Sequence, residues 1–552
     1  MKMLKPETYL REQIAKALAA AFQIENEVEI LLERPRQENF GDYATTVALG
    51  LAKTLRNAPR KIAETLLAHF ADDAGLVDKT SIDGPGFINF TLKPAFWQQY
   101  LLQILSEGER FGASDWGGGE KVQVEFVSAN PTGPLNVVSA RAAAVGDVLV
   151  SLFNQVGFDA KREYYINDAG RQVRLLGASV SARYMQLLGH DEPVPEDGYQ
   201  GDYVIDLARE ILDEVGDRYA ALSKEERAEK LAEVALAKMI RLHQAAMEQY
   251  RVNYDVWFRE SELRRQNKHL QILETLKQKG LTYEKDGAVW FKSSDFGDEK
   301  DRVLITREGE PTYFLVDIAY HEDKYQRGFQ KIYDLWGPDH HGYIARMSAA
   351  IQALGHPKDS FQVRIIQQVN MLRGGEVVKM SKRRGNIIEM QEVLDEVGID
   401  AARFFFIMRK LDQPLDFDID LAKKQTDENP VYYVQYAHAR VSNILEYARS
   451  QGVEIAENVD VSVLQQPEEL SVIKKLAEYP EIISKAAKFL EPHRVTNYLM
   501  ELAGTFHSFY QKHRVVSEDA ALTQARLKLV QGTKRVLKNA LDLLKITAPE
   551  RM

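Results

Sequence analysis

The stretch KVQVEFVSANPTGPLNVVSAR, residues 121–141, decides the fold. It opens with an apolar run of strand length and then enters a loop that is rich in Pro and Gly. A mostly apolar helical pattern over 140–155 follows this loop. A strand, a loop and a helix in this order form the first step of a parallel sheet covered by helices. We therefore predict an α/β domain whose parallel sheet begins here.

A second α/β unit precedes this stretch, over residues 1–112. Helical patterns at 7–22 and 61–72 flank the strand-like run VEILLERP, and GFINFTLK follows the turn sequence DGPG as a further strand. The glycine-rich segment GASDWGGGE is a plausible linker to the sheet domain. We expect a small N-terminal domain.

The remainder divides into three parts. The sheet domain is expected to cover 113–375, with a helical insertion at about 202–280 where long charged amphipathic patterns replace short apolar runs. Strand-like VWFK, RVLI and TYFLVD return between 289 and 317. RGG predicts a hairpin turn into EVVKMSKRRGN, within a connecting region at 376–427. From 428 to 552, apolar residues at a spacing of three to four, punctuated by prolines, predict a helical bundle.

Composition sets the broad class of protein. The chain has 552 residues, of which 45% are hydrophobic and 28% charged, as in globular proteins with sizeable cores. It contains no cysteine, which excludes disulfides and cysteine-ligated zinc. The polar start MKMLKPETYLREQ does not resemble a signal peptide, and no apolar run reaches the length of a membrane span. We expect a cytoplasmic enzyme that does not contact a membrane.

Charge is distributed unevenly along the chain. The net charge is −10, but residues 485–552 hold 12 Lys/Arg against 6 Asp/Glu, a local balance of +6. A basic C-terminal region on an acidic chain is compatible with a large RNA that is bound locally. A solvated helix face remains the alternative.

The string VVKMSKRRG, 377–385, is the strongest local signal. Four cations, Lys379, Lys382, Arg383 and Arg384, stand in a short loop bounded by glycines. Glycines permit movement, and clustered cations suit a polyphosphate whose charge shifts during transfer. From composition alone, an exposed basic loop would look the same.

KMSKR is similar to the second signature of the class I aminoacyl-tRNA synthetases. The runs EFVSANPTGPL, EYYINDAGRQV, YFLVDIAYHEDKY, WGPDHHGY and APERM resemble, in the same order, the bacterial-type arginyl-tRNA synthetases. NFGDYA and DGPGFINF resemble that family's N-terminal domain. The resemblance implies a class I Rossmann-type catalytic domain, an N-terminal domain that contacts tRNA and a helical anticodon-binding domain. It also implies a monomer that takes L-arginine, tRNA(Arg) and ATP with Mg²⁺, and that holds no structural metal.

One signature departs from the family. After PTGPL the family has His-x-Gly-His, whose histidines contact ATP phosphates, whereas this chain has Asn136, Val137, Val138 and Ser139. Asn136 and Ser139 are three residues apart at a helix start, and both side chains can donate hydrogen bonds. We predict that they replace the histidines beside a helix N-terminus that also favours phosphate. The alternative is that they only cap the helix. Val138 adds bulk where the family lets its backbone approach adenine.

The resemblance assigns the ATP site residue by residue. It implies catalytic roles for Lys379, Ser381 and Lys382, shared here with Asn136 and Ser139. It also implies ATP contacts at Pro134 and Met380.

A pocket for arginine needs carboxylates, because a guanidinium is planar and bidentate. The resemblance implies that arginine is bound by Glu125, Ser128, Asn130, Tyr313 and Asp317. Glu125 lies within a strand, where a lone carboxylate is costly unless it is paired. The alternatives are an exposed strand edge for Glu125 and an internal salt bridge or helix cap for Asp317.

His340 and His341 in WGPDHHGY suggest a metal site at first sight. Adjacent histidines on a strand point to opposite faces, and no third ligand is near in the sequence. We expect no metal, and expect Asp339 and His340 to line the arginine and ATP site as in the matching stretch of the family.

The predicted bundle offers two kinds of RNA contact. The aromatic residues could stack bases, although at helical spacing most of them would be core: Tyr432, Tyr433, Tyr436, His438, Phe506, Phe509 and Tyr510. The predicted tRNA-binding cations are Arg526, Lys528, Lys534, Arg535 and Lys538.

These observations predict ATP-dependent ligation of L-arginine to tRNA(Arg) through arginyl-adenylate. The first alternative is a non-catalytic synthetase-like tRNA-binding protein whose altered loop reports lost adenylation. The second is a small-molecule nucleotidylyltransferase, which shares the sheet domain but needs neither flanking domain. A dehydrogenase is disfavoured because no G-x-G-x-x-G follows a strand.

Overall fold

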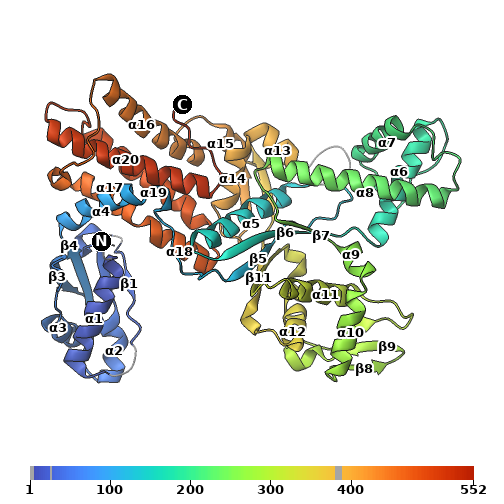
Figure 1. Cartoon of the computed structure of the whole chain (residues 1–552), viewed down its shortest axis with the longest axis horizontal. Helices are drawn as coiled ribbons and strands as arrows, with labels where there is room; N and C mark the ends of the chain where they lie inside the picture. Colours follow the sequence, from blue (N-terminus) through green and yellow to red (C-terminus); the bar gives the residue numbers. More distant parts are fainter. Residues whose placement is uncertain (1–4, 25–27, 36, 379–387) are drawn as a thin grey trace.

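The computed structural model describes residues 5–24, 28–35, 37–378 and 388–552 (Figure 1). Its centre is a parallel five-stranded sheet in the order β12-β11-β5-β6-β7. The strands are β5 (Lys121–Glu125), β6 (Asp159–Ile166), β7 (Val256–Arg259), β11 (Lys331–Trp336) and β12 (Phe361–Ile365). This is the α/β fold expected from the opening stretch, with β5 in the middle. The predictions for Lys379, Met380, Ser381 and Lys382 fall outside the described residues.

Helix α5 (Val137–Gln155) follows β5 and fills the core. It begins three residues earlier than the apolar pattern indicated, because Asn136 is its N-cap. This helix is long and apolar enough to span a membrane by length and composition, but 83% of the relevant window is buried inside the protein. Its apolar character therefore reflects packing against the sheet.

A helical insertion separates β6 from β7 and projects from the sheet (Figure 1). It consists of α6 (Arg171–Leu187), α7 (Asp202–Val215) and α8 (Lys224–Gln249), which share their own apolar cluster. The expected interval of 202–280 was wrong at both ends. The helices begin at Arg171, and Val256–Arg259 is already a strand of the main sheet.

Between β7 and β11 the chain builds a side layer. It contains α9 (Glu260–Arg265), α10 (Lys268–Gln278), α11 (Tyr313–Gln326) and an antiparallel sheet of β8 (Thr282–Lys285), β9 (Ala288–Phe291) and β10 (Arg302–Ile305). Strand-like VWFK and RVLI are confirmed as β9 and β10. TYFLVD is not a strand, since Thr312 caps α11 and the helix starts at Tyr313. Helix α12 (Ile344–Leu354) lies between β11 and β12.

After β12, a small sheet joins the domains. RGG forms the predicted hairpin turn between β13 (Val369–Arg373) and β14 (Glu376–Val377), with both glycines at positive φ. β13 also pairs in parallel with β15 (Leu415–Asp418). Helices α13 (Met390–Val397), α14 (Ile399–Ile407) and α15 (Ile419–Lys423) complete this region.

The N-terminal domain is a four-stranded antiparallel sheet with three helices. The sheet order is β1-β2-β4-β3. Its elements are α1 (Pro6–Phe22), β1 (Leu32–Glu33), β2 (Tyr43–Thr45), α2 (Val47–Leu55), α3 (Pro59–Ala68), β3 (Val77–Asp83) and β4 (Phe87–Leu92). The next helix, α4 (Pro94–Glu107), packs against the C-terminal bundle. A Cβ on Gly532 would stand 2.8 Å from Leu101, so glycine permits this close approach.

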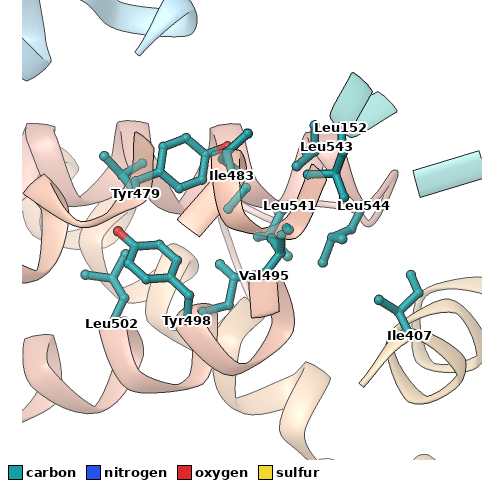
Figure 2. Packing of buried hydrophobic residues seen from close by; sticks show 14 of the residues in the cluster. Leu152, Ile407, Tyr479, Ile483, Val495, Tyr498, Leu502, Leu541, Leu543 and Leu544 are labelled. Carbon is teal, nitrogen blue, oxygen red and sulfur yellow. The ribbon is translucent and has the colours of Figure 1, made fainter. Parts of the chain in front are cut away.

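The C-terminal region is all helical, as predicted. Its long helices are α16 (Pro430–Ser450), α17 (Pro467–Ala477), α18 (Tyr479–Phe489), α19 (His493–Lys512) and α20 (Ala520–Leu543). Pro467 opens α17 and Pro492 is the N-cap residue of α19. Figure 2 shows the core where this bundle meets the sheet domain, with Leu152 of α5 beside Leu543 and Leu544.

Candidate active site

The candidate site lies at the carboxyl ends of β5, β6 and β11. Because the strand order reverses between β5 and β11, the connections leave a crevice there, where open α/β sheets bind ligands. Just beyond β5, Val127 and Ser128 have positive φ values of 70° and 44°. Such conformations are costly for side-chain-bearing residues, above all for β-branched valine, and concentrate at functional sites.

Glu125 is the carboxylate at the end of β5, and only 7% of it is exposed. Its Oε2 accepts hydrogen bonds from Lys324 Nζ at 2.6 Å and Tyr320 Oη at 2.8 Å. Its Oε1 accepts one from Ser128 Oγ at 2.8 Å. The structure thus rules out the exposed-edge alternative for Glu125, and it leaves Oε1 as the less occupied oxygen.

Asp317 lies on α11, one helical turn after Tyr313. Tyr343 Oη donates to Asp317 Oδ2 at 2.6 Å. Burial raises the pKa of Asp317 to about 6, and this hydrogen bond opposes the rise. Tyr313 is 64% exposed at the start of the same helix. A carboxylate this enclosed gains from a cationic ligand, because the ligand replaces lost solvation.

A buried ionic network supports the site from behind. Lys324 is fully buried and also donates to Asp334 Oδ1 at 2.9 Å, while His321 Nε2 lies 2.8 Å from Asp334 Oδ2. Tyr320 Oη also lies 2.7 Å from Glu163 Oε1, so its single proton is shared between Glu125 and Glu163. These residues were not predicted from the sequence. The spacing of Tyr320 and Lys324 by four in AYHEDKY placed them on one helix face, but nothing in the sequence indicated their partners.

The loop at 131–136 ends in the helix cap. Asn136 Oδ1 accepts from Ser139 N at 2.9 Å and from Ser139 Oγ at 3.2 Å. Asn136 is therefore the N-cap of α5, and Ser139 supplies the N–H that it caps. This role does not exclude phosphate binding, since none of the hydrogen bonds found among the described residues uses Asn136 Nδ2.

The segment after the KMSKR string pairs with this same loop. Val137 N donates to Ile388 O at 3.0 Å, and Met390 N donates to Leu135 O at 2.8 Å. Backbone hydrogen bonds therefore connect the loop before α5 to the segment that follows the KMSKR string.

The remaining predicted residues lie nearer the surface. Asn130 is exposed, Pro134 is half-buried, and His340 and His341 are exposed on the 3-10 helix Pro338–Tyr343, which follows β11. The two histidines lie on a helix and not on a strand as expected. Across the described parts of the chain, no group of three His, Asp or Glu side chains could hold a metal ion.

An aromatic cluster with one arginine stands on the bundle surface between α16 and α19. The Arg440 guanidinium lies 4.6 Å from the Tyr436 ring and 5.5 Å from the Tyr510 ring. Tyr432 stacks on Tyr436 with nearly parallel rings. His438, Phe506 and Phe509 are buried, as the core alternative predicted, and Tyr433 is half-buried.

The five predicted tRNA-binding cations do not form one free face. Arg526 is buried and its Nε donates to Glu469 at 2.7 Å. Three others are half-buried and make ion pairs: Lys534 with Glu550, Arg535 with Glu109 and Lys538 with Asp542. Lys528 is half-buried.

Comparison with known proteins agrees with this arrangement. The model of the class I tRNA synthetase (R) catalytic domain matches residues 100–418, so the sheet and its crevice are those of a class I tRNA synthetase. The arginyl tRNA synthetase N-terminal domain matches residues 8–92, and the DALR anticodon binding domain matches residues 434–552. The chain belongs to the arginyl-tRNA synthetase family.

Individual relatives support the assignment over the full length. The chain is 46% identical to arginine–tRNA ligase 1 of Halalkalibacterium halodurans, over 100% of both chains. It is 49% identical to arginine–tRNA ligase of Desulforudis audaxviator, over 94% of this chain and 93% of that protein. The crystal structure of a putative arginyl-tRNA synthetase from Campylobacter jejuni matches with a TM-score of 0.77 at 35% identity, covering 84% of this chain and 100% of that chain.

Proposed function

We propose that this chain attaches L-arginine to tRNA(Arg) at the expense of ATP. The observation that carries the proposal is the pair of carboxylates Glu125 and Asp317 beside the crevice of a class I synthetase sheet. Two carboxylates suit the two edges of a guanidinium. Lys324 and Tyr320 hold Glu125 in place, and Tyr343 holds Asp317, so the pocket is organised before the ligand arrives.

The reaction has two steps. An oxygen of the arginine carboxylate attacks the α-phosphorus of ATP, and the bond to pyrophosphate breaks to give arginyl-adenylate. A hydroxyl of the terminal tRNA ribose then attacks the arginyl carbonyl carbon, loses its proton, and AMP leaves. Mg²⁺ enters as part of the ATP substrate and shields phosphate charge. The chain's own task is to position the reactants and to stabilise charge.

In the altered signature, we propose that Asn136 donates a hydrogen bond to a phosphate of ATP. Its Oδ1 caps α5, which orients the side chain and leaves Nδ2 for the ligand. Ser139 Oγ acts mainly through Asn136, to which it donates. Pro134 and the four KMSK residues Lys379, Met380, Ser381 and Lys382 complete the proposed ATP contacts, and Ser128, Asn130, Tyr313 and His340 the arginine contacts.

For tRNA, we propose that the Tyr436–Arg440–Tyr510 cluster provides a stacking surface on the anticodon-binding domain. Exposed rings with a guanidinium between them suit unstacked bases. Lys528 contributes phosphate contacts, and so do Lys534, Arg535 and Lys538 after exchanging their acidic partners. Arg526 makes no such contact in this proposal, because it is buried in an ion pair with Glu469. We also propose a monomer in the cytoplasm.

Aminoacylation with labelled arginine tests the function. Full-length protein with ATP, Mg²⁺ and a tRNA(Arg) transcript should form arginyl-tRNA, and citrulline, a neutral isostere, should compete poorly because the pocket is anionic. Adenylate formation without transfer would indicate the wrong tRNA. Binding of tRNA(Arg) with no adenylate formation would support the non-catalytic alternative instead.

A further inference from the structure

Helix α8 of the insertion contacts the 131–136 loop directly. His243 of α8 is 1% exposed, and its Nε2 lies 2.8 Å from Gly133 O. A carbonyl only accepts, so Nε2 carries the proton, and Nδ1 lies 3.0 Å from Tyr164 Oη. Burial lowers the pKa of His243, which fits this neutral ring. From α7, Tyr203 Oη donates to Thr132 O at 2.8 Å. The insertion therefore fixes the backbone of the loop.

The other end of α8 meets the end of the bundle. Helix α8 closes with Arg251 at φ 64°, and α20 closes with Lys545 at φ 54°. In each case the N–H of the next residue donates to a carbonyl in the last turn of the helix: Val252 N to Met247 O, and Ile546 N to Leu541 O. Glycine is the usual residue at this left-handed position, because a side chain costs about 1 kcal/mol or more there.

These two basic residues bind each other's helix end. Arg251 Nη1 donates to Lys545 O at 2.9 Å, and Lys545 Nζ donates to Arg251 O at 3.1 Å. We call this reciprocal contact the clasp. It explains why side chains stand at positions that favour glycine, since glycine could make neither bond.

Arg403 closes the junction from α14 and is fully buried. Its Nη1 donates to Tyr250 O at 3.0 Å and its Nε to Leu544 O at 2.9 Å, so one guanidinium holds both helix ends. Its Nη2 donates to Asp147 Oδ2 at 2.6 Å. Lys545 Nζ donates to Asp147 Oδ1 at 2.6 Å. The clasp is therefore bonded to α5 as well.

Two rigid helices thus run from the clasp to the 131–136 loop. Along α8, Arg251 stands eight residues beyond His243, about 12 Å at the helical rise. Along α5, Asp147 stands eleven residues beyond Asn136, about 16 Å. A shift of the α20 end therefore acts on α8, α5 or both, because Lys545 and Arg403 bond the end of α20 to both of these helices.

We propose that α8 is a strut that transmits the position of the anticodon-binding bundle to the 131–136 loop, with Lys545 and His243 as positioning residues at its two ends. This inference rests on the proposed function. Its consequence is that a change at Lys545, in the tail of the bundle, alters the use of ATP while arginine binding stays the same.

The first test is Lys545→Met in the full chain. Arginine-dependent pyrophosphate exchange with tRNA should show the KM for ATP raised about 2- to 30-fold, the range found for residues on a coupling route. The Kd for arginine should not change, and Lys545→Arg should restore most of the loss. The matched control is Lys424→Met, which removes a surface pair with Glu428 and should leave the KM for ATP unchanged. A wild-type KM for ATP in Lys545→Met overturns the proposal.

The second test is a double-mutant cycle with His243→Leu. If both residues act through the same strut, the double variant should lose less than the product of the two single losses. His243→Gln retains an N–H near the Nε2 position and should act nearly as wild type. If the loss in the double variant equals the product of the two single losses, the two residues act independently, and the proposed coupling is wrong.

Folding must be separated from positioning. Thermal unfolding and arginine binding are measured on every variant. If Lys545→Met does not fold, Arg251→Met replaces it, since this change opens the clasp but leaves Asp147 with all of its cations. If the unmodified protein forms no adenylate, the proposed function is wrong. If it forms adenylate and the clasp variants have an unchanged KM for ATP, only the proposed role of α8 is wrong.

Discussion

At the scale of single residues, the two pocket carboxylates have different environments. Glu125 is bonded to Lys324, Tyr320 and Ser128, and the Lys324 ammonium, which it shares with Asp334, offsets part of its charge before arginine binds. In the part of the chain that the structure describes, Tyr343 is the one hydrogen-bond donor to the Asp317 carboxylate, and burial raises the pKa of Asp317 to about 6. We infer that Asp317 carries most of the electrostatic selection for a guanidinium.

Asp317→Asn should weaken arginine binding by about 1.5–3 kcal/mol, the scale of a charged hydrogen bond that is lost. ATP binding should change little. Calorimetric titration with each ligand measures both. If the affinities for arginine and ATP fall equally, either the variant is misfolded or Asp317 does not bind arginine.

The same carboxyl predicts a pH dependence of arginine binding. A cationic ligand prefers the ionised form, so the affinity should fall as the pH is lowered through about 6 and should be level above it. Tyr343→Phe removes a hydrogen bond that lowers the pKa of Asp317, so the midpoint should move upward. A midpoint that also persists in Asp317→Asn would assign the titration to another group.

Asn136 has two functions that substitutions can separate. Asn136→Ser retains an oxygen to cap α5 but removes the amide donor, whereas Asn136→Ala removes both. Single-turnover adenylate formation should fall about 10-fold or more in each, since one donor aimed at a transition state is lost. Only Asn136→Ala should also lose about 0.5–2 kcal/mol of stability. If Asn136→Ser forms adenylate at the wild-type rate, Asn136 acts only as a helix cap.

At the scale of elements, sequence patterns predicted whether a segment is a helix or a strand better than they predicted where it begins and ends. KVQVEFV was identified as the first sheet strand because it is apolar, short and followed by a turn. TYFLVD fits strand and helix equally over six residues, and only the cap at Thr312 and the pattern beyond it decide for a helix. The support of Glu125 by Lys324 could not be predicted, since 199 residues separate the two side chains.

The stacking surface on α16 and α19 gives a prediction at this scale. Tyr436→Leu should weaken tRNA binding by about 1–3 kcal/mol, the value of one stacked base, because it also removes the ring over which Arg440 lies. Tyr447→Leu, an exposed tyrosine on the same helix outside the cluster, is the control. Filter binding at constant salt measures both variants, and equal effects would contradict a specific stacking role.

At the scale of the whole molecule, the N-terminal domain and the bundle meet at a titrating contact. Burial and a hydrogen bond to Glu481 raise the pKa of Glu7 to about 7, and Arg34 Nε donates to Glu481 Oε2 at 3.3 Å. A carboxyl whose pKa is raised by folding stabilises the fold fully below its unfolded pKa. That contribution disappears as the pH rises through about 7.

As the pH rises from the ordinary pKa of 4.5 to about 7, the melting temperature should therefore fall by an amount that Glu7→Gln removes, because glutamine keeps the donor and does not titrate. Differential scanning calorimetry of both proteins across this range gives the difference directly. Parallel profiles for the two proteins would show that other groups cause the change.

The central claim is that the pocket selects arginine for adenylation at this sheet. The most direct measurement is arginine-dependent pyrophosphate exchange, with tRNA present, in the unmodified protein and in Asp317→Asn. We predict exchange that depends on arginine and is not supported by citrulline, and that Asp317→Asn raises the KM for arginine while leaving that for ATP nearly unchanged. No exchange by the unmodified protein, or exchange that Asp317→Asn leaves unaltered, would contradict the account.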